Sequence, residues 1–167
     1  MEEHELVDIN GKNTGKVLTH TEAQDINNIP KGYYLPIVGV VIINNKNEIL
    51  LQKRSSLKRV NPNKWGLSGG KSNFGETTEE SALRETLEEI GVKLDKEKLK
   101  FLCANIVDEV YYGTVYYIYQ DVDVDKCVLQ EEEVAEVKYF KIDEVERLNN
   151  EGIEWLDDLK KVLNKNT

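Results

Sequence analysis

Residues 70–92 read GKSNFGETTEESALRETLEEIGV, and this stretch contains a helix with recognisable ends. Thr77 with Glu80 three residues later forms a capping-box signature, which marks the start of a helix. Gly91 stands where a left-handed residue commonly ends one. The pattern therefore predicts a helix over residues 77–91, which begins at the Thr77 cap.

Three glutamates share one face of this helix. At about 100° per residue, with Glu85 at zero, Glu89 lies near +40° and Glu88 near −60°. Neighbouring like charges destabilise a helix by a few tenths of a kcal/mol per pair, and a hard cation such as Mg²⁺ would reverse that effect. A solvated acidic face is the alternative reading of three glutamates alone. The residues predicted to pack on the opposite side are Leu83, Leu87 and Ile90.

The loop before the helix adds glycines and a further acid. Gly69, Gly70 and Gly75 allow the backbone to come close to a metal or a phosphate, and Glu76 ends the loop. From Gly70 to Val92 the chain resembles the Nudix box, GxxxxxE followed by REUxEExGU, where U is apolar. Two small departures are present. They are Thr86 at the first U position and Ser68 where many members have proline.

The sequence on either side predicts the fold. Residues 37–43 and 48–53 read as a central hairpin, residues 99–107, 110–119 and 134–140 as further strands, and residues 143–164 as largely helical. This order favours an α/β or α+β sandwich. The resemblance, which covers about residues 35–150, implies a Nudix-like α/β/α sandwich with a central mixed sheet. We expect one domain over residues 1–167.

That domain has three expected parts. Residues 1–32 form an N-terminal hairpin and loop, in which residues 5–9 and 17–19 are the strands. Residues 35–150 form the core, and residues 151–167 form a C-terminal helix.

Nudix enzymes hydrolyse a nucleoside diphosphate linked to another moiety, using Mg²⁺ or Mn²⁺ and a water that attacks phosphorus. The resemblance implies that Glu85, Glu88 and Glu89 are metal ligands, with the Gly69 carbonyl as a further one. Glu85, Glu88 and Arg84 would form the catalytic set. Arg84 would hold a carboxylate such as Glu76 or Glu85 in its metal-binding orientation.

Two parts of the chain could supply the general base that takes a proton from the attacking water. In some Nudix members it is the carboxylate that matches Glu85. In others it comes from a later loop, which here would supply Glu131, Glu132 or Glu133. A solvated acidic turn is the plain interpretation of those three residues.

Residues that would recognise the substrate are less evident from the sequence. Aromatic side chains that could stack a base are Tyr33, Tyr34, Phe74, Tyr111 and Tyr112. Basic side chains that could meet phosphate are Lys53, Arg54, Lys58 and Arg59. Because aromatic and basic residues are common in cores and on surfaces, ordinary packing is the first interpretation of each.

The formal charge of −9 disfavours nucleic acid and anionic membranes as partners, because both need a basic face. An anionic nucleotide remains compatible when bound metal supplies positive charge. The longest apolar or glycine run, residues 37–43, is far shorter than the roughly 20 residues of a membrane-spanning helix. With two cysteines and an acidic N-terminus, we expect the cytoplasm. The sequence leaves open whether the protein forms a homodimer.

Two other functions compete with hydrolysis. The N-terminal hairpin is similar to that of the isopentenyl-diphosphate-isomerase-like branch, but isomerases of that type use a cysteine ahead of the box. Residues 65–70 contain none, and Cys103 lies well after the helix. A non-catalytic nucleotide-binding module would show eroded glutamates, whereas Glu76, Glu85, Glu88 and Glu89 are all present.

Overall fold

The fold was taken from a computed structural model that describes residues 2–148 and 154–165. Its strands are β1 (Glu3–Val7), β2 (Asn13–Thr19), β3 (Leu35–Ile43), β4 (Ile49–Arg54), β5 (Trp65–Gly66), β6 (Ser68–Lys71), β7 (Lys100–Val107), β8 (Tyr111–Tyr119) and β9 (Val134–Phe140). Its helices are α1 (His20–Ala23), α2 (Thr78–Ile90), α3 (Ile142–Leu148) and α4 (Glu154–Lys165). Three short 3₁₀ turns join them: η1 (Ile26–Asn28), η2 (Lys96–Lys98) and η3 (Val124–Lys126).

A seven-stranded mixed sheet forms the centre of the molecule. The strand order is β5-β4-β3-β8-β7, with β6 also paired to β3 and β9 to β4. Strands β3 and β4 are antiparallel, as the predicted central hairpin requires. Strands β3 and β8 run parallel, from Leu35 opposite Tyr111 to Ile43 opposite Tyr119. The predicted α/β class and the central mixed sheet are confirmed.

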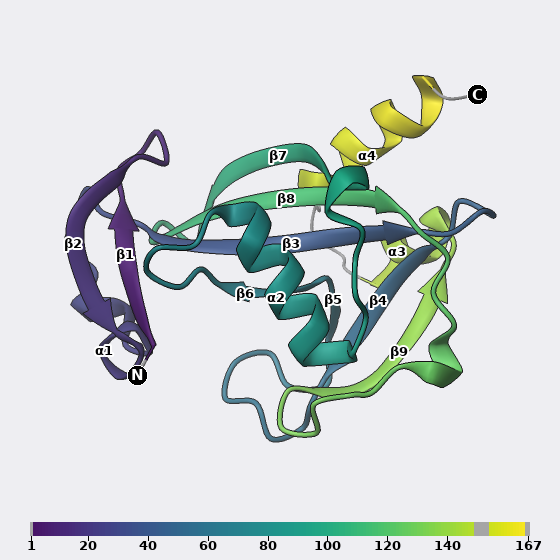
Figure 1. The fold of residues 1–167 in the computed structure, drawn as a ribbon, viewed down its shortest axis with the longest axis horizontal. Helices are drawn as coiled ribbons and strands as arrows, with labels where there is room; N and C mark the ends of the chain where they lie inside the picture. The colour runs from purple at the N-terminus through teal and green to yellow at the C-terminus, as the bar shows by residue number, and fades with distance from the viewer. Residues whose placement is uncertain (1, 149–153, 166–167) are drawn as a thin grey trace.

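Helices cover both faces of this sheet (Figure 1). Because successive side chains of a strand point to opposite faces, β3 feeds two cores. Val40 and Ile42 pack with Ile90 of α2, while Val41 packs with Leu159 of α4 on the other face. All five side chains are essentially without exposure. The layers are therefore α/β/α, and α2 has one face of the sheet to itself among the α-helices that the structure describes.

The N-terminal hairpin is also confirmed, although its first strand begins earlier than predicted. β1 and β2 pair in antiparallel fashion, and Gly11 adopts a positive φ of 80° in the turn between them. Ile9 lies beyond β1 and is 63% exposed. The hairpin sits at one end of the main sheet (Figure 1), where Val7 bridges to Tyr34.

The C-terminal part agrees with the helical prediction where the structure describes it. Helices α3 and α4 cover Ile142–Leu148 and Glu154–Lys165. The first and last residues of the predicted helix over 151–167 lie outside the described residues. Cys103 and Cys127 are free thiols. In the described part of the chain, no helix has the length and apolarity to cross a membrane.

The predicted packing face of α2 was partly wrong. Leu87 is 52% exposed, and Thr86 is fully buried instead, with its Oγ1 donating to the Ala82 carbonyl at 2.9 Å. Since this bond satisfies the hydroxyl, threonine can face the sheet. The buried residues of the helix are Ser81, Ala82, Thr86, Glu89 and Ile90.

Candidate active site

Helix α2 begins and ends as the sequence predicts. Thr77 Oγ1 accepts from the Glu80 N–H at 3.1 Å, and the Glu80 carboxylate accepts from the Thr77 N–H at 3.1 Å. At the other end Gly91 has φ 71° and donates to the Leu87 carbonyl. Both ends of the helix are thus closed by local hydrogen bonds. The carboxylates of the site are therefore carried by a well-defined element.

Arg84 is the centre of the site's hydrogen-bond network. Its Nε and NH2 bind both oxygens of Glu76, at 2.7 and 3.0 Å. Its NH1 donates to Glu85 at 2.9 Å and to Glu88 at 3.2 Å, and NH2 also donates to the Lys71 carbonyl at 3.0 Å. Burial opposes its charge, but the surrounding carboxylates raise the pKa of the guanidinium. One cation thus orients three glutamates.

Glu76 fastens the loop to the helix. Besides Arg84, its Oε1 accepts from the Asn73 N–H at 2.8 Å and from Ser81 Oγ at 2.9 Å. Burial alone would raise the pKa of Glu76, yet hydrogen bonds from Arg84, Asn73 and Ser81 outweigh it and lower the pKa. Glu76 is therefore ionised and fully engaged in positioning Arg84.

Glu89 is the most deeply buried acid of the site, with 5% of its surface exposed. Its Oε1 accepts from the Gly69 N–H at 2.8 Å, and its Oε2 accepts from Gln52 Nε2 at 3.3 Å. Ser68 Oγ in turn donates to Gln52 Oε1 at 3.0 Å. Burial raises the pKa of Glu89 to about 8, Gly69 opposes the rise, and the charge of Glu85 adds to it.

Gly69 and Gly70 lie where other atoms of the protein come too close to leave room for a Cβ. A Cβ on Gly69 would lie 1.9 Å from the Val38 carbonyl oxygen, so β6 could not pair with β3 at this distance. A Cβ on Gly70 would lie 2.7 to 2.8 Å from all three carboxyl atoms of Glu85. The absent side chain of Gly70 therefore makes room for the Glu85 carboxylate.

These residues fit a divalent cation. Burial raises the pKa of the Glu85 carboxyl, Arg84 counters this, and the charges of Glu88 and Glu2 add to it. Glu88 is half-exposed, with 47% of its side chain in contact with solvent. Carboxylate and carbonyl oxygens are the donors that Mg²⁺ and Mn²⁺ prefer, and positive charge placed among them would relieve their repulsion. The chemistry of the donor set agrees with such an ion.

Of the three later glutamates, Glu133 is the one that the structure brings toward the site. Its charge raises the pKa of both Glu89 and Lys71, and its carboxylate is ion-paired with Lys58 Nζ. Glu131 and Glu132 are exposed in the turn before β9.

Sequence reasoning missed three residues of this region. Gln52 and Ser68 orient Glu89. The negative charges of Glu133 and Glu85 raise the pKa of Lys71, which is the third of these residues. Burial lowers the pKa of the Lys71 ammonium, and Lys58 lowers it further. A signal for Gln52 was present in the sequence, because it follows Leu50 by two positions on a strand and so shares its inward face.

The proposed recognition residues divide into packed and exposed ones. Tyr33 and Tyr111 pack on the core of the N-terminal hairpin, and Arg54 Nε donates to the Val60 carbonyl at 3.0 Å. Phe74 is 55% exposed in the loop before α2. Tyr112 lines a hollow of about 350 Å³ that lies between the hairpin and the segment before α2, where Ser72, Asn73 and residues 75–78 line it.

Comparison with known proteins gives one consistent family. The NUDIX domain family model matches residues 33–159. An uncharacterized Nudix hydrolase of Listeria monocytogenes is 33% identical over 153 residues, which cover 91% of this chain and 87% of that protein. A nucleoside triphosphatase of Enterobacter is 30% identical over 109 residues, covering 59% of this chain and 76% of the relative.

Solved structures agree in fold. A Deinococcus radiodurans protein, DR0079, superposes with a TM-score of 0.69 at 21% identity over 86% of each chain. The NUDIX domain of Shewanella oneidensis NrtR, solved with ADP ribose, superposes with a TM-score of 0.65 at 19% identity. The superposed region covers 87% of this chain and 99% of the NrtR domain.

Proposed function

Because this chain belongs to the Nudix hydrolase family, we propose that it is a metal-dependent pyrophosphohydrolase that cleaves the diphosphate linkage of a nucleoside diphosphate derivative. The observation that carries the proposal is the network around Arg84, which connects Glu76 of the preceding loop with Glu85 and Glu88 of α2. Two neighbours support the substrate class. One is a nucleoside triphosphatase, and the other was solved with ADP ribose.

Within this proposal the glutamates have separate tasks. Glu85, Glu88 and Glu89 would hold Mg²⁺ or Mn²⁺, with the Gly69 carbonyl as a further ligand. Such an ion polarises phosphoryl oxygens and lowers the pKa of the attacking water. Arg84 is a positioning residue, because it fixes the carboxylates against one another. Phosphoryl transfer depends mainly on this kind of positioning and charge neutralisation.

The base that takes the proton from water is either Glu85 or one of Glu131, Glu132 and Glu133, and Glu133 is tested first because its charge reaches Glu89. Glu133→Gln is that test. If Glu133 is the base, its loss lowers kcat by about 10²- to 10⁴-fold. An unchanged kcat excludes Glu133 and favours Glu85, whose carboxylate accepts from Arg84 at 2.9 Å. Glu131→Gln and Glu132→Gln then test the two exposed glutamates of the same turn.

The cysteine that isopentenyl-diphosphate-type isomerases use ahead of the box has no counterpart near this site. Cys103 lies on β7, where Asp158 and Glu154 of α4 act on its thiol, on the face of the sheet opposite α2. The two free thiols accord with a cytoplasmic location, which we propose for the protein.

The test is a substrate panel in Mg²⁺ and ¹⁸O-labelled water. NDP-sugars, dinucleoside polyphosphates, ADP-ribose and nucleoside triphosphates are incubated with the protein, and the products are identified by mass spectrometry. We expect hydrolysis of at least one class, with the label in a phosphate product. Intact metal binding without turnover on any of them would favour the non-catalytic module.

Glu88→Gln is the matched site variant, because Glu88 is half-exposed and its loss leaves the core untouched. We expect Mg²⁺-dependent hydrolysis to be abolished while the circular dichroism spectrum stays unchanged. Glu79→Gln, an exposed glutamate in the first turn of the same helix, is the control and should retain full turnover. Normal turnover and metal affinity in Glu88→Gln would contradict the assignment.

A further inference from the structure

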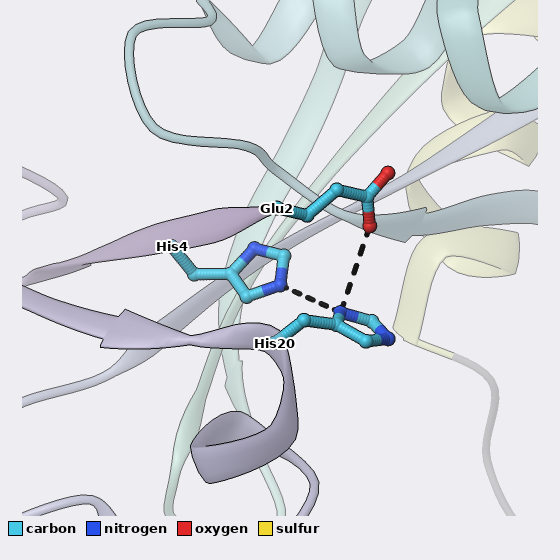
Figure 2. Close-up of side chains that lie close together, drawn as sticks. All are labelled: Glu2, His4 and His20. Carbon is cyan, nitrogen blue, oxygen red and sulfur yellow. Dashed lines mark hydrogen bonds and ion pairs between the residues drawn. The ribbon is translucent and has the colours of Figure 1, made fainter.

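A group of side chains of the kinds that can bind a metal ion lies at the N-terminal hairpin, outside the Nudix box. Glu2 and His4 come from the start of the chain and from β1, and His20 is the first residue of α1 (Figure 2). Their ligand atoms all lie within 4.8 Å of one another. His4 Nε2 is 2.9 Å from His20 Nδ1, which is 3.7 Å from Glu2 Oε2.

The orientation of His4 is fixed by the loop before α2. His4 is 1% exposed, and its Nδ1 lies 2.6 Å from the Ser72 carbonyl oxygen. A carbonyl can only accept, so Nδ1 carries the proton and Nε2 of the neutral ring presents a lone pair to the cluster. Metal-binding histidines are usually held in this way, with the second nitrogen donating to a backbone carbonyl.

The spacing suits a tetrahedral ion after small shifts. With Zn–N bonds of about 2.0 to 2.1 Å, two imidazole nitrogens lie about 3.3 Å apart. The His4–His20 N···N distance must widen by a few tenths of an ångström, the His20–Glu2 N···O distance must shorten by a similar amount, and the His4–Glu2 pair must close from a distance within 4.8 Å. The side chains of His20 and Glu2 are 42% and 52% exposed, so they have room to adjust.

We propose that Glu2, His4 and His20 bind a Zn²⁺ ion, with water in the fourth position. Two imidazoles and one carboxylate suit zinc, whereas Mg²⁺ prefers a shell of oxygens.

The ion would join β1 to the start of α1, next to the two hydrogen bonds that connect the hairpin with the loop before α2. Ser72 already accepts from His4, and the Phe74 N–H donates to the Glu3 carbonyl at 2.7 Å. Zinc would add a link between β1 and the start of α1 beside these two bonds. The proposed role of the ion is to stabilise this end of the hairpin, and its ligands differ from those proposed for Mg²⁺ or Mn²⁺, although the charge of Glu2 reaches Glu85.

A simple hydrogen bond between the two imidazoles is the competing interpretation. In that case His20 carries its proton on Nδ1 and donates to His4 Nε2. Zinc binding instead requires that the proton of neutral His20 leave Nδ1 and reside on its outer nitrogen, Nε2. The tautomer of His20 therefore distinguishes the two states.

The experiment is a zinc titration of the full chain by calorimetry in excess Mg²⁺, which occupies oxygen-rich sites. We expect one equivalent of Zn²⁺ to bind, the thermal unfolding temperature to rise, and the ¹⁵N shifts of His20 to report the change of tautomer. His20→Ala and Glu2→Gln should each weaken zinc binding at least tenfold. Two variants are used so that a folding defect in one leaves the other informative.

Glu3→Gln is the control, because Glu3 is the exposed neighbour on the same strand and its side chain is not a member of the cluster. It should bind zinc as the unmodified chain does. The proposal is overturned if the unmodified chain binds no zinc in excess Mg²⁺, or if both cluster variants bind it with unchanged affinity. Either result leaves the proposed hydrolase activity unaffected, since that is measured with Mg²⁺ on nucleotides.

Discussion

At the scale of single residues, two adjacent glycines have different tasks that alanine substitution separates. In Gly69→Ala the new Cβ meets backbone at 1.9 Å, so β6 must move away from β3. We expect a loss of about 1 to 3 kcal/mol in the free energy of unfolding. In Gly70→Ala the Cβ meets the end of the flexible Glu85 side chain. Stability should fall less, while displacement of Glu85 lowers kcat/KM by about 10- to 100-fold.

Chemical denaturation and steady-state kinetics on both variants check this pair. Gly66→Ala serves as the control, since a Cβ at Gly66 has no atom within 4 Å, and it should alter neither quantity strongly. Equal stability losses in Gly69→Ala and Gly70→Ala would contradict the division of tasks.

At the scale of elements, the same capping box starts α1 and α2 and permits a matched comparison. Thr19 and Thr77 each accept from the backbone N–H three residues later. Alanine at either position should destabilise the protein by about 1 kcal/mol. Because Thr77 adjoins Glu76 and caps the helix that carries Glu85 and Glu88, only Thr77→Ala should also lower kcat. Equal kcat values for the two variants would show that the cap does not influence the site.

The limits of helix α2 could be predicted from the sequence, but its buried face could not be placed fully. Capping depends on residues close in the chain, and Thr77 and Gly91 specify it locally. Which side meets the sheet depends on β3 and β6, which lie elsewhere. Leu87 therefore faces solvent at 52% exposure, while Thr86 is buried because its hydroxyl bonds to Ala82.

The same distinction applies to the site. Glu85, Glu88 and Arg84 follow from the spacing of the box. The alternation along its strand indicates that Gln52 points inward, but only the pairing of the strands shows that Gln52 and Lys71 lie beside the site. The contact of His4 with Ser72 joins residues far apart in the chain, and no local pattern indicates it.

At the scale of the whole molecule, the two faces of the sheet separate stability from catalysis. Leu159 of α4 is fully buried on the face opposite α2. Leu159→Ala should lower the free energy of unfolding by about 2 to 5 kcal/mol. At temperatures where the variant stays folded, kcat and KM should match those of the unmodified chain, because the change lies across the sheet from the glutamates. Thermal unfolding and kinetics measured together test this expectation.

The parallel pairing of β3 with β8 also bears on how the protein is made. Strand β8 follows the entire box in the chain, yet it lies beside β3, which precedes the box. During synthesis α2, which carries Glu85, Glu88 and Glu89, therefore leaves the ribosome before β8, the strand that pairs with β3. Long-range parallel pairing is slow compared with helix formation. We therefore expect a nascent chain that ends before Tyr111 to lack a finished site, so that hydrolytic competence appears late in synthesis.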